Sequence, residues 1–317
     1  MKFYRDLHPS NEDLIGKFDG LGDVSEIELL KKYTGGQIVN VDKTTGLVFA
    51  QSRRKSNEIA NEWSNKVYKN KEVKEKEYQY TGLIPIMKSR HLFVVDTLNN
   101  SIPGGLSGKS ICDIGAGEGY FLDLAKNIYN ANVFGVEPST QNCSYLKDKG
   151  IKFFNGTAED YFLKDSVQGT FDIVSLNWTL CNCSNCNRIM EIAFQILNED
   201  GYLVVSDSSR LLTPFKKSLS LYFEPSLSLD LHAWFFSFNT IRCLMALHGF
   251  MPIFQNNHHE QNDLITIASK KINDINTLGP EAYFDDYRKV ISFFERWEKE
   301  SQNYKYRDRG GYNLLSK

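Results

Sequence analysis

Between residues 110 and 207, short apolar runs alternate with stretches in which apolar side chains recur every three or four residues. The apolar runs cover residues 110–115, 132–136, 151–155, 171–176 and 202–205. They are almost continuous in apolar residues, as is typical of strands in a parallel sheet that helices cover on both faces. The pattern predicts an α/β fold with a doubly wound, mostly parallel sheet.

The pattern changes after residue 207. Residues 208–235 hold several aromatic side chains without a clear period, which predicts an irregular cap. Ser237 is then placed to begin a helix and Gly249 to end it, because short polar residues favour helix starts and glycine favours helix ends. Two strand-like runs and an amphipathic helix complete the pattern, at 250–255, 263–268 and about 281–299.

The first 80 residues carry a different pattern, and the length of 317 residues exceeds that of a usual single domain. Apolar runs at 37–41 and 47–50 flank the turn residues DKTTG and predict a small hairpin. Charged helical stretches follow at about 55–78, and an apolar helix at 83–100 leads into the first strand. We therefore predict an accessory region at 1–80, a main domain at 81–270 that includes the cap at 208–235, and a helical extension at 271–317.

Composition narrows the possible partners. Lys and Arg number 37 and Asp and Glu 39, so the net charge of −2 gives no overall attraction to nucleic acid or to an anionic membrane. No apolar run reaches the roughly 18 residues of a membrane helix, and the first residues lack the apolar stretch of a secretory signal. Six cysteines are too few for a disulfide scaffold. We expect a cytoplasmic protein with reduced thiols and no nucleic-acid or membrane partner, and a homodimer stays open.

A glycine-rich turn follows the first strand of the main domain, with the order Asp113-x-Gly115-x-Gly117-x-Gly119. Glycines allow a tight turn and let a ligand approach the backbone. A plain tight turn between strand and helix is the alternative. A dinucleotide site would read Gly-x-Gly-x-x-Gly and lie against a pyrophosphate, which the carboxylate of Asp113 would repel. The acid instead suits a ligand with a positive amino group and no phosphate.

The second strand ends in a carboxylate, Glu137. An acid at the tip of the neighbouring strand can accept hydrogen bonds from both hydroxyls of a ribose, each worth about 1.5–3 kcal/mol. Together with the turn, this acid indicates a nucleoside that carries an amino-acid tail.

Five segments in this order resemble the motifs of the class I S-adenosylmethionine-dependent methyltransferases: ICDIGAGEGYF, VFGVEPS, GTAEDYF, FDIVSLNW and ILNEDGYLVVSD. The resemblance covers about residues 85–270. It implies a seven-stranded, Rossmann-like sheet whose last strand is antiparallel, with S-adenosylmethionine as cofactor and S-adenosylhomocysteine as product. It also implies a cofactor site made of Asp113, Gly115, Ala116, Gly117, Glu137, Ala158, Glu159, Asn177 and Trp178.

The resemblance assigns a part of the cofactor to each motif. Asp113 and the glycines would line the methionine moiety, and Glu137 would hold the ribose. Residues 158–159 would border the adenine, and residues 177–178 would lie beside the sulfonium. This chain has Thr157 where many relatives have Asp, which weakens the adenine assignment.

Candidate acceptor residues come from the cap and from the helix before the first strand. A hydroxyl acceptor benefits from a general base, since its own pKa is far above 7. His232 in the cap and His91 on the entering helix are the candidates, with simple packing as the alternative for each. Further acceptor contacts are expected from Asp207, Arg210 and Trp234, with solvation of Arg210 as the alternative.

The segments SDSSRLLTPFKK and LHAWFFS also resemble methyltransferases of surface-polysaccharide and sugar modification. This implies a hydroxyl of a sugar or a nucleotide-linked sugar as acceptor. Some of those relatives bind zinc through paired cysteines near the N-terminus, but the first cysteine here is Cys112. Cys181, Cys183 and Cys186 lack the paired spacing of a zinc site, so a reduced loop beside the cleft is expected and no metal.

Three other functions were compared with this one. Methylation of carbon or nitrogen in another small metabolite stays open. Methylation of nucleic acid is disfavoured, because residues 177–179 read Asn-Trp-Thr and not the Asn/Asp-Pro-Pro-aromatic sequence of such enzymes. A binding module without chemistry would have no need for Asp113 and Glu137 together. The sequence does not identify the acceptor.

Overall fold

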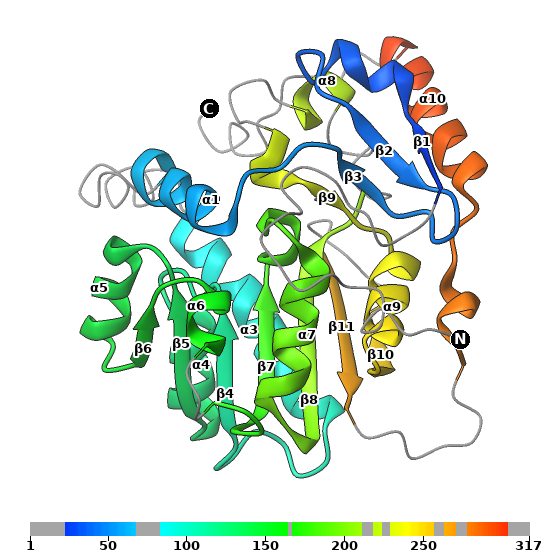
Figure 1. Cartoon of the computed structure of the whole chain (residues 1–317). Helices are drawn as coiled ribbons and strands as arrows, with labels where there is room; N and C mark the ends of the chain where they lie inside the picture. The colour runs from blue at the N-terminus through cyan, green and yellow to red at the C-terminus, as the bar shows by residue number, and fades with distance from the viewer. Residues whose placement is uncertain are drawn as a thin grey trace.

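The computed structural model describes residues 23–67, 83–163, 167–210, 218–223, 229–256, 263–270 and 278–303. These residues form a seven-stranded sheet and a separate four-stranded sheet. The small sheet lies beyond the carboxyl ends of the parallel strands of the large one (Figure 1).

The large sheet has the strand order β10-β11-β8-β7-β4-β5-β6. Its strands are β4 (Ser110–Ile114), β5 (Asn132–Glu137), β6 (Lys152–Asn155), β7 (Phe171–Asn177), β8 (Leu197–Ser208), β10 (Met251–Gln255) and β11 (Asp263–Ser269). The strands from β6 to β8 pair in parallel, and β11 runs antiparallel to both β8 and β10. The predicted α/β class and the antiparallel last strand are confirmed.

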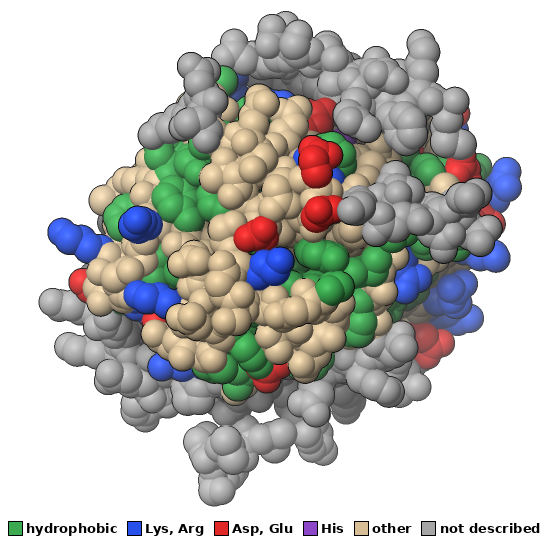
Figure 2. Space-filling model, turned by 90° about the horizontal axis from the view of Figure 1, so that it is seen from below, with side chains coloured by type: hydrophobic (Ala, Val, Ile, Leu, Met, Phe, Trp, Pro, Cys, Tyr) green, Lys and Arg blue, Asp and Glu red, His purple; other side chains and the backbone are tan. Residues whose placement is uncertain are grey.

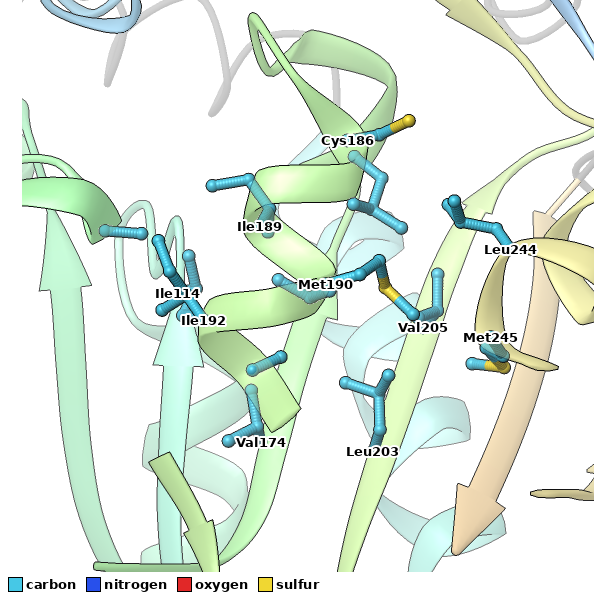
Figure 3. Close-up of a cluster of buried hydrophobic side chains, with 14 of the residues drawn as sticks. Ile114, Val174, Cys186, Ile189, Met190, Ile192, Leu203, Val205, Leu244 and Met245 are labelled. Atoms are coloured by element: carbon cyan, nitrogen blue, oxygen red, sulfur yellow. The ribbon is translucent and has the colours of Figure 1, made fainter. Parts of the chain in front are cut away.

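Helices cover both faces of the large sheet, as the continuous apolar strands predict. They are α3 (Leu83–Ser101), α4 (Tyr120–Tyr129), α5 (Thr140–Asp148), α6 (Ala158–Phe162), α7 (Cys186–Ile196) and α9 (Phe238–Leu247). Apolar side chains of α3, α4 and α5 pack on one face, and those of α6, α7 and α9 on the other. Figure 3 shows Met190 of α7 reaching towards Val205 of β8, with Val174 of β7 and the α9 residues Leu244 and Met245 in the same cluster.

The strand order reverses direction at β4, which pairs with β5 on one side and β7 on the other. In open α/β sheets, ligands bind outside the carboxyl ends of the strands at such a switch point. The site is therefore expected at this end of the large sheet, next to the small sheet. Figure 2 shows the opposite end of the molecule, where acidic and basic side chains are scattered among apolar ones.

The small sheet combines segments that lie far apart in the sequence. Its strands are β1 (Val24–Glu26), β2 (Val39–Asp42), β3 (Val48–Ala50) and β9 (Trp234–Phe235). The predicted β2–β3 hairpin is confirmed. The region expected to be an irregular cap supplies β9 and the short helix α8 (Leu219–Tyr222).

A long C-terminal helix, α10 (Tyr287–Asn303), packs against the small sheet. It begins later than predicted, because the carboxylate of Asp286 accepts the N–H of Arg288 and a 3-10 turn, Pro280–Tyr283, precedes it. Phe223 and Phe235 of the expected cap pack with Phe294 in the apolar core of this layer. Their aromatic rings therefore stabilise the second layer.

The expected helical stretch at 55–78 contains α1 (Ser56–Glu62) and a π-helical turn, Trp63–Val67. The charged run 69–77 lies outside the described residues. Among the described residues, no helix combines the length and the apolar character needed to cross a membrane.

Candidate active site

The glycine-rich turn between β4 and α4 adopts a conformation that needs glycine. Gly115 and Gly117 have φ angles of +75° and +55°, in the left-handed region. A Cβ atom on Gly115 would lie 2.4 Å from Oγ1 of Thr179, whereas one on Gly117 would meet no atom within 4 Å. Close packing against Thr179 thus requires glycine at position 115. At Gly117, the missing side chain leaves open space beside the turn.

Glu137 at the tip of β5 is joined to this turn. Its Oε2 accepts the N–H of Gly117 at 2.8 Å, and its Oε1 accepts the N–H of Ser139 at 2.9 Å. The side chain is 5 % exposed. Two backbone donors therefore hold the carboxylate at the switch point of the sheet.

Asp113 at the end of β4 is fully buried. Its Oδ1 accepts hydrogen bonds from Oγ of Ser175 at 2.7 Å and from Nδ2 of Asn177 at 3.1 Å. Burial raises the pKa of Asp113 to about 7, although both hydrogen bonds favour the charged form. Oδ1 of Asn177 is also buried and has no hydrogen-bond partner among the described residues. The pair offers oxygen acceptors to a ligand that carries an ammonium group.

Two cavities open at the carboxyl ends of the strands. The smaller cavity, of about 160 Å³, and the larger cavity, of about 230 Å³, share Gly115, Gly117, Trp178 and Asn182 as lining residues. Of the predicted cofactor residues, Glu137, Ala158 and Glu159 line the smaller cavity, and Asp113, Ala116 and Asn177 line the larger one. The structure thus brings every predicted cofactor residue to one continuous site.

Trp178, the residue shared by both cavities after β7, is held in an unusual conformation. Its φ angle is +52°, which is rare for a large side chain, and its N–H donates to the carbonyl of Ser206 at 2.6 Å. The guanidinium carbon of Arg90 lies 4.0 Å from the centre of its ring, and the imidazole of His91 meets the ring edge-on at 5.0 Å. Backbone strain of this kind clusters at functional sites.

Three residues of α3 line the larger cavity: Met87, Arg90 and His91. Burial, together with the neighbouring charge of Arg90, lowers the pKa of His91 to about 3, so the imidazole is neutral at pH 7. Nδ1 of His91 is buried without a hydrogen-bond partner among the described residues. Sequence reasoning found His91 but missed Arg90, whose only signal was its position next to that histidine.

His232 does not line either cavity among the described residues. Its side chain is exposed and meets the ring of Trp63 edge-on, with ring centres 5.7 Å apart. Trp63 in turn lines the smaller cavity. His232 thus contacts a residue of the cavity wall.

The residues predicted to contact the acceptor, Asp207, Arg210 and Trp234, each make contacts within the protein. Arg210 is 1 % exposed and pairs with Asp285, Nη2 to Oδ2 at 2.9 Å. Asp207 accepts the N–H of Cys181 at 2.9 Å, so its carboxylate fixes the turn after β7. None of the three lines either cavity.

Trp234 is buried in the small sheet and donates its Nε1–H to the carbonyl of Cys183 at 2.9 Å. This bond fixes the cysteine loop from the opposite side. Burial raises the pKa of the Cys181, Cys183 and Cys186 thiols. Sγ of Cys183 donates to the carbonyl of Leu180 at 3.1 Å, so these thiols pack within the loop.

The fold and the site are those of a class I methyltransferase, since a seven-stranded sheet of this order carries cavities lined by a glycine-rich turn and two carboxylates at its switch point. A family model described as a methyltransferase domain matches residues 88–256, more than half of the chain. The chain belongs to this family, and S-adenosylmethionine is its cofactor.

The chain is also similar to individual methyltransferases. The chain is 25% identical over 158 residues to a demethylmenaquinone methyltransferase of Lactococcus lactis subsp. lactis, a match that covers 47% of this chain and 61% of that relative. A solved methyltransferase structure from Thermotoga maritima matches 67% of this chain and 100% of its own, at 20% identity and a TM-score of 0.48. A chain in a Haloferax volcanii methyltransferase–activator complex matches 62% of this chain and 97% of its own, at 14% identity and a TM-score of 0.50.

Proposed function

We propose that this methyltransferase acts on a small molecule and that the methylated group is a hydroxyl of a sugar or of a nucleotide-linked sugar. The observation that carries the assignment is the pair of cavities that meet at Gly115, Gly117 and Trp178, with Asp113 on one side and Glu137 on the other. The resemblance of residues 206–217 and 231–237 to sugar methyltransferases supports the sugar. The reaction is expected in the cytoplasm, where the buried thiols stay reduced.

The residues present fit the cofactor part by part. Glu137 would accept hydrogen bonds from the ribose hydroxyls, and Ala158 with Glu159 would border the adenine in the smaller cavity. Asp113 and the unpartnered Oδ1 of Asn177 would accept from the amino group of the methionine tail. When bound, the cofactor supplies a methyl group on a positively charged sulfur.

An acceptor would approach where the cavities join. Trp178 and Asn182 line both cavities, and Nδ2 of Asn182 donates to the carbonyl of Trp178 at 2.7 Å. Apolar side chains of α1 and the following turn, Ile59, Ala60 and Trp63, close the smaller cavity. They would exclude water, which favours a displacement reaction that depends mainly on positioning.

His91 is the histidine placed to receive a hydrogen bond from an acceptor hydroxyl. Its imidazole lines the larger cavity and is neutral at pH 7, since its pKa is lowered to about 3. A group with so low a pKa is suited to orient the hydroxyl. It is less suited to act as the general base that takes up the hydroxyl proton. His232 remains a second candidate base, provided that the Trp63 ring moves aside.

Carbon methylation of an aromatic ring is the second candidate. The relative from Lactococcus lactis is named for demethylmenaquinone, and the site here presents the indole rings of Trp63 and Trp178. Aromatic walls of this kind suit a flat ring as well as they suit the apolar face of a sugar.

Transfer of an isotopically labelled methyl group would separate these functions. The protein is incubated with the labelled cofactor and, in parallel, with neutral sugars, nucleotide-linked sugars and hydroquinones, and the product is analysed by NMR. A methoxyl signal on a sugar supports the proposal, and a methyl signal on a ring carbon replaces it with the second candidate. Cofactor binding without transfer to any acceptor would contradict both.

A further inference from the structure

One wall of the smaller cavity comes from outside the methyltransferase family match, which begins at residue 88. Ser56, Ile59 and Ala60 of α1, with Trp63 of the following turn, line this cavity. The facing wall comes from the tips of β4, β5 and β6, with residues that the motif resemblance assigns to the nucleoside. Figure 1 shows α1 above the carboxyl ends of β5 and β6. The N-terminal region therefore encloses the nucleoside end of the site.

A hydrogen bond crosses from this wall to the large sheet. Oγ of Ser56 donates to Oε1 of Glu159 at 2.6 Å, and both residues line the smaller cavity. They are 103 residues apart in the sequence. A carboxylate has about four acceptor sites, so the second oxygen of Glu159 can still accept from a ligand. Ser56 thus fixes the rotamer of the carboxylate that faces the expected adenine.

The segment that leads into α1 is anchored to a second loop of the same cavity. Arg53, which is 5 % exposed, donates from Nε to the carbonyl of Ser184 at 2.8 Å, and its guanidinium lies 4.4 Å from the Trp234 ring. Oγ of Ser184 donates back to the carbonyl of Arg54 at 2.6 Å. Ser184 itself lines the smaller cavity. Bonds to Ser184 and to Glu159 therefore hold α1 across the cavity.

We propose that Ser56 is a positioning residue through which the N-terminal region recognises the nucleoside of the cofactor. Its hydroxyl orients Glu159 to accept the exocyclic amino group of adenine and seats Ile59 and Trp63 over the base. This inference rests on the proposed function, because it assumes that the cofactor occupies the two cavities. It assigns the accessory region to cofactor binding, where sequence reasoning left it without a defined role.

The inference is tested with two ligands that share the nucleoside. S-adenosylhomocysteine carries the amino-acid tail, and 5′-methylthioadenosine lacks it. Calorimetric titration of Ser56→Ala should show both ligands weakened by the same factor, about 10-fold, because Glu159 is no longer held in position for its charged hydrogen bond to the adenine. Ser56→Thr keeps the hydroxyl and should restore most of the affinity. Arg90→Met removes a cation from the larger cavity, where the amino-acid tail with its carboxylate is expected, and should weaken S-adenosylhomocysteine alone.

Ser144→Ala is the matched control, since its half-buried hydroxyl bonds only the carbonyl of Gln141 within α5 among the described residues. It should change neither affinity, and thermal unfolding of each variant reports on folding. Unchanged affinity of Ser56→Ala for both ligands would overturn the inference, as would a loss confined to S-adenosylhomocysteine. If the unmodified protein binds neither ligand, the proposed function fails, which is a different result.

Discussion

Two regions were expected to build the site, and the structure uses them differently. The tips of β4, β5 and β7 supply cavity-lining residues at each predicted position, from Asp113 to Trp178. Of the candidates between β8 and α9, none lines either cavity, and Arg210 and Trp234 are buried in contacts with other segments. A strand tip is placed by the sheet itself, whereas the place of a long connection depends on its distant partners.

The largest effect is expected for the buried pair in the second region. Arg210→Ala leaves the carboxylate of Asp285 without its cation, and breaking such a pair costs about 3–5 kcal/mol of unfolding free energy. Chemical denaturation measures this loss. Arg188→Ala is the control, because the Arg188–Glu191 pair is partly exposed and should cost at most about 1 kcal/mol. A stable Arg210→Ala protein that has lost acceptor turnover would return Arg210 to the acceptor site.

In the first region, the strongest effect is expected at the turn. Gly117→Val should weaken S-adenosylhomocysteine at least about 100-fold, because the side chain would fill the open space shared by the two cavities. Gly104→Val is matched to it, with φ at +74° and no atom within 4 Å of an added Cβ. Both variants bear the same backbone strain, so equal affinity in the two would show that the turn does not bind the ligand.

A smaller loss is expected at the tip of β5. Glu137→Ala should weaken S-adenosylhomocysteine by about 1.5–3 kcal/mol, through the loss of the ribose contacts. Titration calorimetry would show the effect for 5′-methylthioadenosine as well, because both ligands contain the ribose. An affinity equal to that of the unmodified protein would remove the ribose assignment.

The two candidate histidines, His91 of α3 and His232 of the second region, can be compared directly in catalysis. His91→Ala should lower kcat about 10-fold, the effect of one lost hydrogen bond to the acceptor, and His232→Ala should change it by less than about 2-fold. Steady-state rates over pH 6–9 measure both. Since the pKa of His91 is lowered to about 3, its own titration should not shape this profile. The reverse order of effects would make His232 the base.

The smallest effect is expected in the protonation of Asp113. Because burial raises the pKa of Asp113 to about 7, its carboxyl is largely protonated at pH 6, and a ligand ammonium should drive that proton off. Binding of S-adenosylhomocysteine at pH 6 should then release up to about one proton, falling towards zero by pH 9. Calorimetry in buffers of different ionisation enthalpy detects this release. 5′-Methylthioadenosine, or the Asp113→Asn variant, should release none, and equal release in all three would contradict the assignment.

A pKa that is raised in the folded protein also makes the free energy of unfolding depend on pH. A carboxyl whose pKa is higher in the folded protein than in the unfolded chain stabilises the fold when protonated, and this contribution is lost as pH rises from about 4 to about 7. In the Asp113→Asn variant, the free energy of unfolding should therefore decrease less with rising pH over this pH range.

Sequence reasoning was most successful where one local pattern determines both structure and chemistry. The apolar runs predicted the strands of the large sheet, and the carboxylates of Asp113 and Glu137 both line the site because parallel strands end at one edge. The N-cap at Ser237 was also predicted, and its hydroxyl accepts the N–H of Thr240.

The remaining features depend on contacts between distant segments. Nothing near Arg210 in the sequence points to Asp285, and nothing near Trp234 points to the carbonyl of Cys183. Ser56 likewise gave no signal, because its partner Glu159 belongs to a different domain of the predicted division. The small sheet could not be predicted for the same reason. Its strand β9 is only two residues long, and its partner β3 lies far earlier in the sequence.

A crystal structure of the protein grown with excess S-adenosylhomocysteine tests the central claim most directly. We predict the ribose hydroxyls against the carboxylate of Glu137, the amino group beside Asp113 and the base beneath Trp63. Ligand bound elsewhere on the protein, with both cavities filled by protein side chains, would contradict the account.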